Sequence, residues 1–306
     1  SALTGRGKAR RPGLIGHGLL ALMNHAHGLA NGAPLLFRRQ ALEAGVGGQF
    51  DVDAEAIGQA LASLEKANAD VPVRGRRHRI EHCGFITKAQ IAQMLARAGY
   101  AVLRLNFRGS GNYGRAHMQA GAREWGGAMQ DDLTDATRWA IEQGVAAPGR
   151  ICLFGASYGG YASLMGVAKE PALYRCAAGY VGVYDVDMLF KKGDIPQRDS
   201  GLRYLRRTHG TERADWNRAS PALRAAEVKI PVYLAAGARD VRAVPEQTEL
   251  MNKALIAAGN KPEGMIIQSG EMHGFYGEEA RVNLYTEMLK FFDRHIGAGG
   301  TTPARN

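Results

Sequence analysis

The feature that most constrains the fold is a short apolar strand that runs into a serine between two glycines. Residues 151–154 (Ile-Cys-Leu-Phe) are typical of a buried strand, Gly155-Ala-Ser-Tyr-Gly159 follows, and 161–169 read as a helix. The turn between strand and helix is sharp, so side chains at the two glycines would collide with their neighbours. We therefore predict that Ser157 stands clear of a sheet and that the Tyr158 N–H lies at the positive end of a helix.

Strand, G-x-S-x-G and helix together form the nucleophile elbow of α/β-hydrolases. The strand–helix alternation along the rest of the chain predicts a mainly parallel sheet with helices on both faces, preceded by a partial βα segment. The predicted boundaries are a partly disordered N-terminal segment at 1–76, a hydrolase domain at 77–297 and a tail at 298–306.

A serine hydroxyl becomes a nucleophile only when a base takes its proton. In this fold the chain order is serine, acid, histidine. Asp240 follows the predicted strand 230–236, and His273 follows the predicted strand 264–269 in a loop with flanking glycines. We predict Ser157 as nucleophile, His273 as base and then acid, and Asp240 as the group that orients the imidazole.

Other acids and histidines compete for these roles. Asp185 and Asp187 also follow a predicted strand, although the loop of His273 should neighbour the strand of Asp240 more directly. His117 and His209 fall in predicted loops, and we expect both on the surface.

Several stretches beyond the pentapeptide occur in a fixed order. They are Gly99–Ser110, Trp125–Asp132, Gly155–Tyr161, Ala219–Pro221, Gly237–Asp240 and His273–Gly274. In their order and spacing, residues of about 95–297 resemble the catalytic domain of prolyl oligopeptidase family serine peptidases. The resemblance implies hydrolysis of peptide or small ester substrates through an acyl-enzyme on Ser157, without a cofactor. It also places Arg242 where the family binds a carbonyl of the substrate.

Acyl transfer also needs hydrogen-bond donors for the oxyanion. The Tyr158 N–H is one candidate, but the family's His-Gly-Gly-Pro-like motif for a second donor is missing. The nearest substitute follows residues 77–81, which we expect to fill the vacant place in the sheet, with Cys83 or Gly84 offering a backbone N–H. The missing motif leaves an alternative open, a catalytically impaired hydrolase fold that binds ligand without turnover.

The N-terminal third carries a second, shorter resemblance. Residues of about 50–95, with Arg-Ile-Glu-His82, resemble a fragment of the metal-dependent amidohydrolase superfamily, in which His82 would be a metal ligand. The other ligands of such a site are missing, so we predict no metal centre.

Net charge and composition limit the classes of binding partner that we expect. The formal net charge is +10, but no nucleic-acid motif accompanies the basic clusters, which we interpret as solvated faces. No apolar run reaches the roughly eighteen residues of a membrane span, so we expect neither nucleic acid nor membrane as a partner. Cys83, Cys152 and Cys176 fit no metal motif and are expected to be buried thiols. The cytoplasm is slightly favoured, the periplasm stays open if a signal peptide was removed, and the oligomeric state is undetermined.

Overall fold

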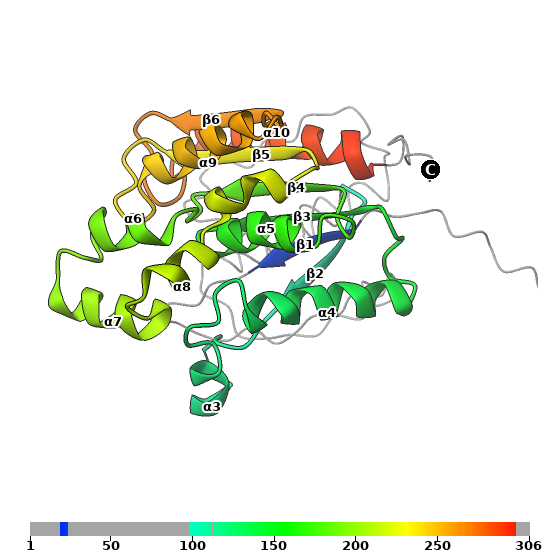
Figure 1. The fold of residues 1–306 in the computed structure, drawn as a ribbon. Coiled ribbons are helices and arrows are strands. Elements are labelled where there is room, and N and C mark those ends of the chain that lie inside the picture. The colour runs from blue at the N-terminus through cyan, green and yellow to red at the C-terminus, as the bar shows by residue number, and fades with distance from the viewer. Residues whose placement is uncertain (1–18, 24–97, 112, 298–306) are drawn as a thin grey trace, which may run out of the picture.

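A six-stranded parallel sheet forms the centre of the computed structural model, in the order β2-β1-β3-β4-β5-β6 (Figure 1). The structure describes residues 19–23, 98–111 and 113–297. With helices packed against this sheet, the chain has the α/β-hydrolase fold that the sequence predicts. The strands are β1 Leu19–Met23, β2 Ala101–Leu105, β3 Ile151–Ala156, β4 Cys176–Tyr180, β5 Val232–Gly237 and β6 Gly264–Gln268.

The central strands are buried on both faces, which explains their continuous apolar runs. Because side chains alternate along a strand, Leu153 and Phe154 of β3 belong to two different core clusters. The first cluster includes residues of α4, α5 and α9, and the second is built on α10. The helices are α3 Gly114–Gln119, α4 Ala128–Glu142, α5 Tyr158–Lys169, α6 Val186–Lys191, α7 Asp199–His209, α8 Arg213–Arg218, the 3-10 helix η2 Pro221–Glu227, α9 Pro245–Ala257 and α10 Glu278–Ile296.

The strand beside the elbow comes from the start of the chain. β1 pairs in parallel with both β2 and β3, and Met23 is in register with Leu105 on one side and Gly155 on the other. The sequence had suggested that residues 77–81 fill this place, and that expectation is wrong because β1 occupies it. β1 thus lies in the same sheet as the strands of the predicted hydrolase domain.

The segment between β4 and β5 is helical rather than irregular. Residues 184–218 read as an irregular excursion in the sequence, whereas the structure places α6, α7 and α8 there (Figure 1). Asp185 caps α6 by accepting from the Met188 N–H at 3.1 Å, a local signal of the kind that starts a helix. This helical insert lies directly before η2 and β5 in the chain and contributes Leu205 to the first core cluster.

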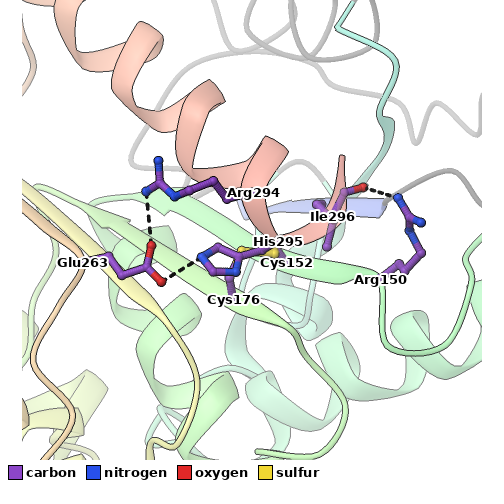
Figure 2. Close-up of a disulfide and its surroundings, with 7 residues drawn as sticks. All are labelled: Arg150, Cys152, Cys176, Glu263, Arg294, His295 and Ile296. Atoms are coloured by element: carbon purple, nitrogen blue, oxygen red, sulfur yellow. Dashed lines mark hydrogen bonds and ion pairs between the residues drawn. A yellow bond between two sulfur atoms is a disulfide. The ribbon is translucent and has the colours of Figure 1, made fainter. Parts of the chain in front are cut away.

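Cys152 and Cys176 form a disulfide, which corrects the expectation of free buried thiols. The two residues are register partners on the adjacent strands β3 and β4, and both are fully buried. Adjacent parallel strands hold their Cα atoms 4.6 Å apart, within the range that a disulfide spans. The bond therefore ties the elbow strand to β4 (Figure 2).

The end of α10 is fixed close to this disulfide (Figure 2). Arg150, directly before β3, donates to the carbonyls of Ile296, the last residue of the helix, at 2.8 Å and of Gly297, which follows it. Glu263 lies 3.1 Å from Arg294 and 3.0 Å from His295. These contacts join the end of the C-terminal helix to the residues directly before β3 and β6.

In the part of the chain that the structure describes, no helix combines the length and hydropathy needed to cross a bilayer. The amidohydrolase-like stretch with His82, the candidate donors Cys83 and Gly84, and the tail 298–306 lie outside the described residues.

Candidate active site

The elbow places Ser157 at a strained turn between β3 and α5. Its φ of 57° and ψ of −118° lie in a region that residues other than glycine rarely adopt. The turn is possible because Gly155 has no side chain: a Cβ there would lie 2.5 Å from the carbonyl carbon of Gly159. The Ser157 N–H donates to the Tyr180 carbonyl of β4 at 2.9 Å, which anchors the turn to the sheet. The hydroxyl is therefore held on a rigid element rather than on a free loop.

Three side chains far apart in sequence meet at the elbow. The Oγ of Ser157 lies 2.9 Å from Nε2 of His273, and Nδ1 of His273 lies 2.8 Å from Oδ2 of Asp240. Each residue follows the carboxyl end of a strand: β3, β5 and β6. Since these ends of a parallel sheet share one edge, residues separated by 116 positions in the sequence can form one hydrogen-bonded chain.

Asp240 is arranged to accept from His273. Its side chain is fully buried, and Oδ1 accepts the backbone N–H groups of Arg242 at 2.8 Å and Ala243 at 2.9 Å. With Oδ1 satisfied, Oδ2 faces the imidazole and favours the tautomer that carries its proton on Nδ1. The bare Nε2 then points at the serine hydroxyl, which is the arrangement that a general base needs.

The loop that carries His273 is held by Glu271. The carboxylate of this residue accepts the backbone N–H groups of Tyr276 at 2.5 Å and Gly277 at 2.9 Å. The carbonyl of Glu271 accepts from the N–H of Arg239, one residue before the acid, at 2.8 Å. The loops of the histidine and of the acid are thus bonded to each other, a pairing that the sequence did not reveal.

The competing acids are occupied elsewhere. Asp185 is the cap of α6, and Asp187 forms ion pairs with Lys191 and Arg213 on the surface. The imidazole of His273 instead pairs with Asp240 and Ser157. The structure therefore brings together the three residues that the sequence favoured.

The structure describes some of the residues that were predicted to contact the oxyanion and the substrate. Tyr158 is the first residue of α5, so its N–H lies in the first turn of a helix, where partial positive charge gathers. The argument for Cys83 and Gly84 is lost, because it required residues 77–81 to lie in the place that β1 occupies. Arg242 forms a bidentate ion pair with Asp194 at 2.7 and 2.8 Å, and this pairing lowers the pKa of the Asp194 carboxyl.

A cavity of about 320 Å³ opens beside Ser157 and His273. Its remaining lining is mostly apolar or aromatic and comes from the elbow, the end of β4, the helical insert and Trp125, together with Arg242 and Ala243. A second, more polar cavity of about 580 Å³ shares Ile195, Tyr204 and Arg242 with it. The lining of the first cavity includes Trp125, Tyr158, Val181, Val183, Leu189, Tyr204, Leu205 and His209.

Both histidines that were expected on the surface are at least partly covered. His117 on α3 is half-buried, with Nε2 3.1 Å from the carbonyl of Phe107. His209 is buried and lines the cavity beside Ser157, so its assignment to the surface is wrong. Within the described ranges, no cluster of three or more His, Cys, Asp or Glu side chains could hold a metal ion.

The family model of the prolyl oligopeptidase family matches residues 87–299. The chain belongs to this family. Dipeptidyl aminopeptidase BIII of Pseudoxanthomonas mexicana is 37% identical over 198 residues, which cover 60% of this chain and 27% of the relative. Dipeptidyl peptidase family member 6 of Caenorhabditis elegans is 28% identical over 240 residues, covering 76% of this chain and 32% of the relative.

Solved structures of peptidases also resemble this chain. A puromycin-hydrolyzing peptidase of Mycobacterium tuberculosis matches with a TM-score of 0.60 and 27% identity, over 65% of this chain and 30% of that one. An acylaminoacyl peptidase of Pyrococcus horikoshii matches with a TM-score of 0.62 over 70% of this chain and 35% of that one; at 22% identity, this likeness shows the fold alone. The chain spans about a third or less of the length of the curated relatives named above.

Proposed function

We propose that the chain is a serine peptidase that cleaves peptide bonds through an acyl-enzyme on Ser157. The observation that carries the proposal is the continuous hydrogen-bonded chain from Ser157 through His273 to the buried Asp240. Membership of the prolyl oligopeptidase family, whose relatives are named as peptidases, supports the same reaction.

The first half of the reaction follows from this geometry. Nε2 of His273 takes the hydroxyl proton of Ser157 while Oγ bonds to the carbonyl carbon of the substrate. The tetrahedral intermediate collapses when the C–N bond breaks, and His273 returns the proton to the departing amine. Asp240 holds the imidazole and stabilises its charged form throughout. In the second half, water repeats these steps on the ester and releases Ser157.

The contacts of the substrate are part of the proposal. The N–H of Tyr158 is proposed as one donor to the oxyanion, and the loss of one such donor typically lowers kcat by about 10²–10³. Arg242 remains a candidate for binding a substrate carbonyl. Arg242 donates to Asp194 through Nε and Nη2. Its Nη1 is therefore left for a ligand in the adjoining cavities.

A fluorophosphonate probe tests the nucleophile directly. Native protein should be labelled on Ser157, should hydrolyse peptide anilides, and should lose both properties in Ser157→Ala. Thr211→Ala, which removes an exposed hydroxyl between α7 and α8 outside the lining of both cavities, is the control and should retain both. A well-folded protein that neither labels nor hydrolyses anilides or p-nitrophenyl esters would instead be the impaired hydrolase fold that binds without turnover.

A further inference from the structure

A buried histidine without a hydrogen-bond partner lines the cavity beside Ser157. His209 is the last residue of α7 and is only 5% exposed. It shares the lining of this cavity with Ser157 and His273, so a ligand that fills the cavity has access to both the nucleophile and this ring. The triad does not use His209.

The ring of His209 is held in an aromatic setting. Trp125 meets it edge to face with 4.5 Å between ring centroids, and Phe190 lies 6.4 Å away. Its Nδ1 is buried and has no hydrogen-bond partner among the described residues. Burying a polar side chain without a partner costs free energy, so an imidazole left in this state beside a cavity is suited to a hydrogen-bond partner that the ligand brings.

The ring is also neutral at physiological pH. Burial lowers the pKa of His209 from its ordinary value of 6.5 to about 4. No Asp or Glu is among the described residues that line the cavity, and the one arginine there is already paired with Asp194. The cavity therefore offers a neutral hydrogen-bonding group within a mainly aromatic and aliphatic wall.

We propose that His209 makes this cavity selective for tyrosine as the residue whose carbonyl Ser157 attacks. The inference rests on the proposed peptidase function and names the side chain that its specificity pocket takes. An aromatic ring packs against Trp125 and Tyr158, and its single hydroxyl pairs with the imidazole of His209, which lines the cavity. The hydroxyl can donate or accept, so it suits either tautomer of the neutral imidazole.

Other side chains fit this cavity less well. Phenylalanine and leucine would fill apolar space but leave the imidazole of His209 without a hydrogen-bond partner. Lysine and arginine would find no carboxylate among the described lining residues, and aspartate and glutamate would have to compete for an arginine that Asp194 already holds. Glutamine carries both an acceptor and two donors, and most of them would be buried without partners.

Paired substrates that differ by one hydroxyl test the inference. Kinetic constants are measured for N-acyl-tyrosine and N-acyl-phenylalanine p-nitroanilides. One neutral hydrogen bond should give the tyrosine substrate about a tenfold higher kcat/KM in the native protein. In His209→Leu this ratio should fall to about one, whereas His209→Asn, which keeps a hydrogen-bonding tip, should retain part of it.

Leu205→Val is the matched control, because it changes the packing of the same cavity wall and keeps the imidazole. Its ratio of tyrosine to phenylalanine turnover should stay at the native value. A native protein that prefers phenylalanine, or a ratio that is the same in His209→Leu, would overturn the inference.

Binding without turnover separates this inference from the proposed function. Ser157→Ala is titrated with N-acetyl-tyrosine amide and N-acetyl-phenylalanine amide, and the ring nitrogens of His209 are followed by NMR. Tighter binding of the tyrosine amide with a shift of the ring signals supports the pocket even if native protein proves inactive. Equal affinities with an unmoved ring contradict it, even if the fluorophosphonate labels Ser157.

Discussion

Acid should destabilise the folded protein through His209. In the unfolded chain this residue accepts a proton near pH 6.5, whereas in the folded protein burial lowers its pKa to about 4. Between these two values the unfolded state binds a proton that the folded state does not, so the free energy of unfolding falls as the pH falls. This contribution to stability is fully present above pH 6.5 and is lost progressively toward pH 4.

The size of the effect follows from the pKa difference. At pH 5 the solution is about 1.5 units below the pKa of the histidine in the unfolded chain. Because each unit corresponds to 1.36 kcal/mol, the protonation of His209 should lower the free energy of unfolding by about 2 kcal/mol. The side chain is only 5% exposed, so solvent screening takes little from this figure. A loss of this size is a large fraction of the stability of an ordinary domain.

Urea unfolding of native protein and of His209→Leu at pH 7, 6 and 5 measures this contribution. Between pH 7 and pH 5, the free energy of unfolding should fall by about 2 kcal/mol more in native protein than in His209→Leu. The other titrating groups are common to both proteins, so their effects largely cancel. Leu205→Val, which loosens the same wall but keeps the histidine, should follow the native pH dependence. Parallel losses in native protein and His209→Leu would refute the reasoning.

Three further changes test the elbow and its supports. Asp240→Asn should preserve the circular dichroism spectrum but lower kcat by about 10⁴, because the imidazole loses its orienting acceptor; a loss of less than tenfold would contradict the assigned role. Gly155→Ala should cost about 1–3 kcal/mol in urea unfolding, since its Cβ would lie 2.5 Å from the Gly159 backbone, and a stability equal to native would argue against this elbow. Replacing Cys152 and Cys176 together with alanine should cost about 3 kcal/mol for a bond across 24 residues, and an unchanged urea midpoint would show that the bond does not form.

The triad could be predicted because each of its members has a local signal. Glycines on either side of Ser157 mark the turn, and Asp240 and His273 each follow an apolar segment of strand length. In a parallel sheet, position at the carboxyl end of a strand is enough to predict a shared edge. The order of the residues in the chain then assigns their roles.

The features that the sequence missed depend on contacts between distant segments. Leu19–Met23 is a short apolar run like many others, and only its pairing with β2 and β3 makes it the strand beside the elbow. The disulfide needs Cys152 and Cys176 to be in register on neighbouring strands, which a spacing of 24 residues does not reveal. His209 is polar and follows a run of arginines, yet Trp125, more than eighty positions earlier, helps to bury it.

Two histidines line one cavity, and their partners give them different uses. His273 has an acceptor at Nδ1 and a hydroxyl at Nε2, so it can take a proton from Ser157 while Asp240 stabilises the resulting charge. His209 faces no carboxylate among the described lining residues and keeps a buried nitrogen without a partner. A ring in that setting is a poor base, since the charge it would gain has nothing to offset it. Its remaining chemistry is hydrogen bonding as a neutral group, which is what recognition of an uncharged hydroxyl requires.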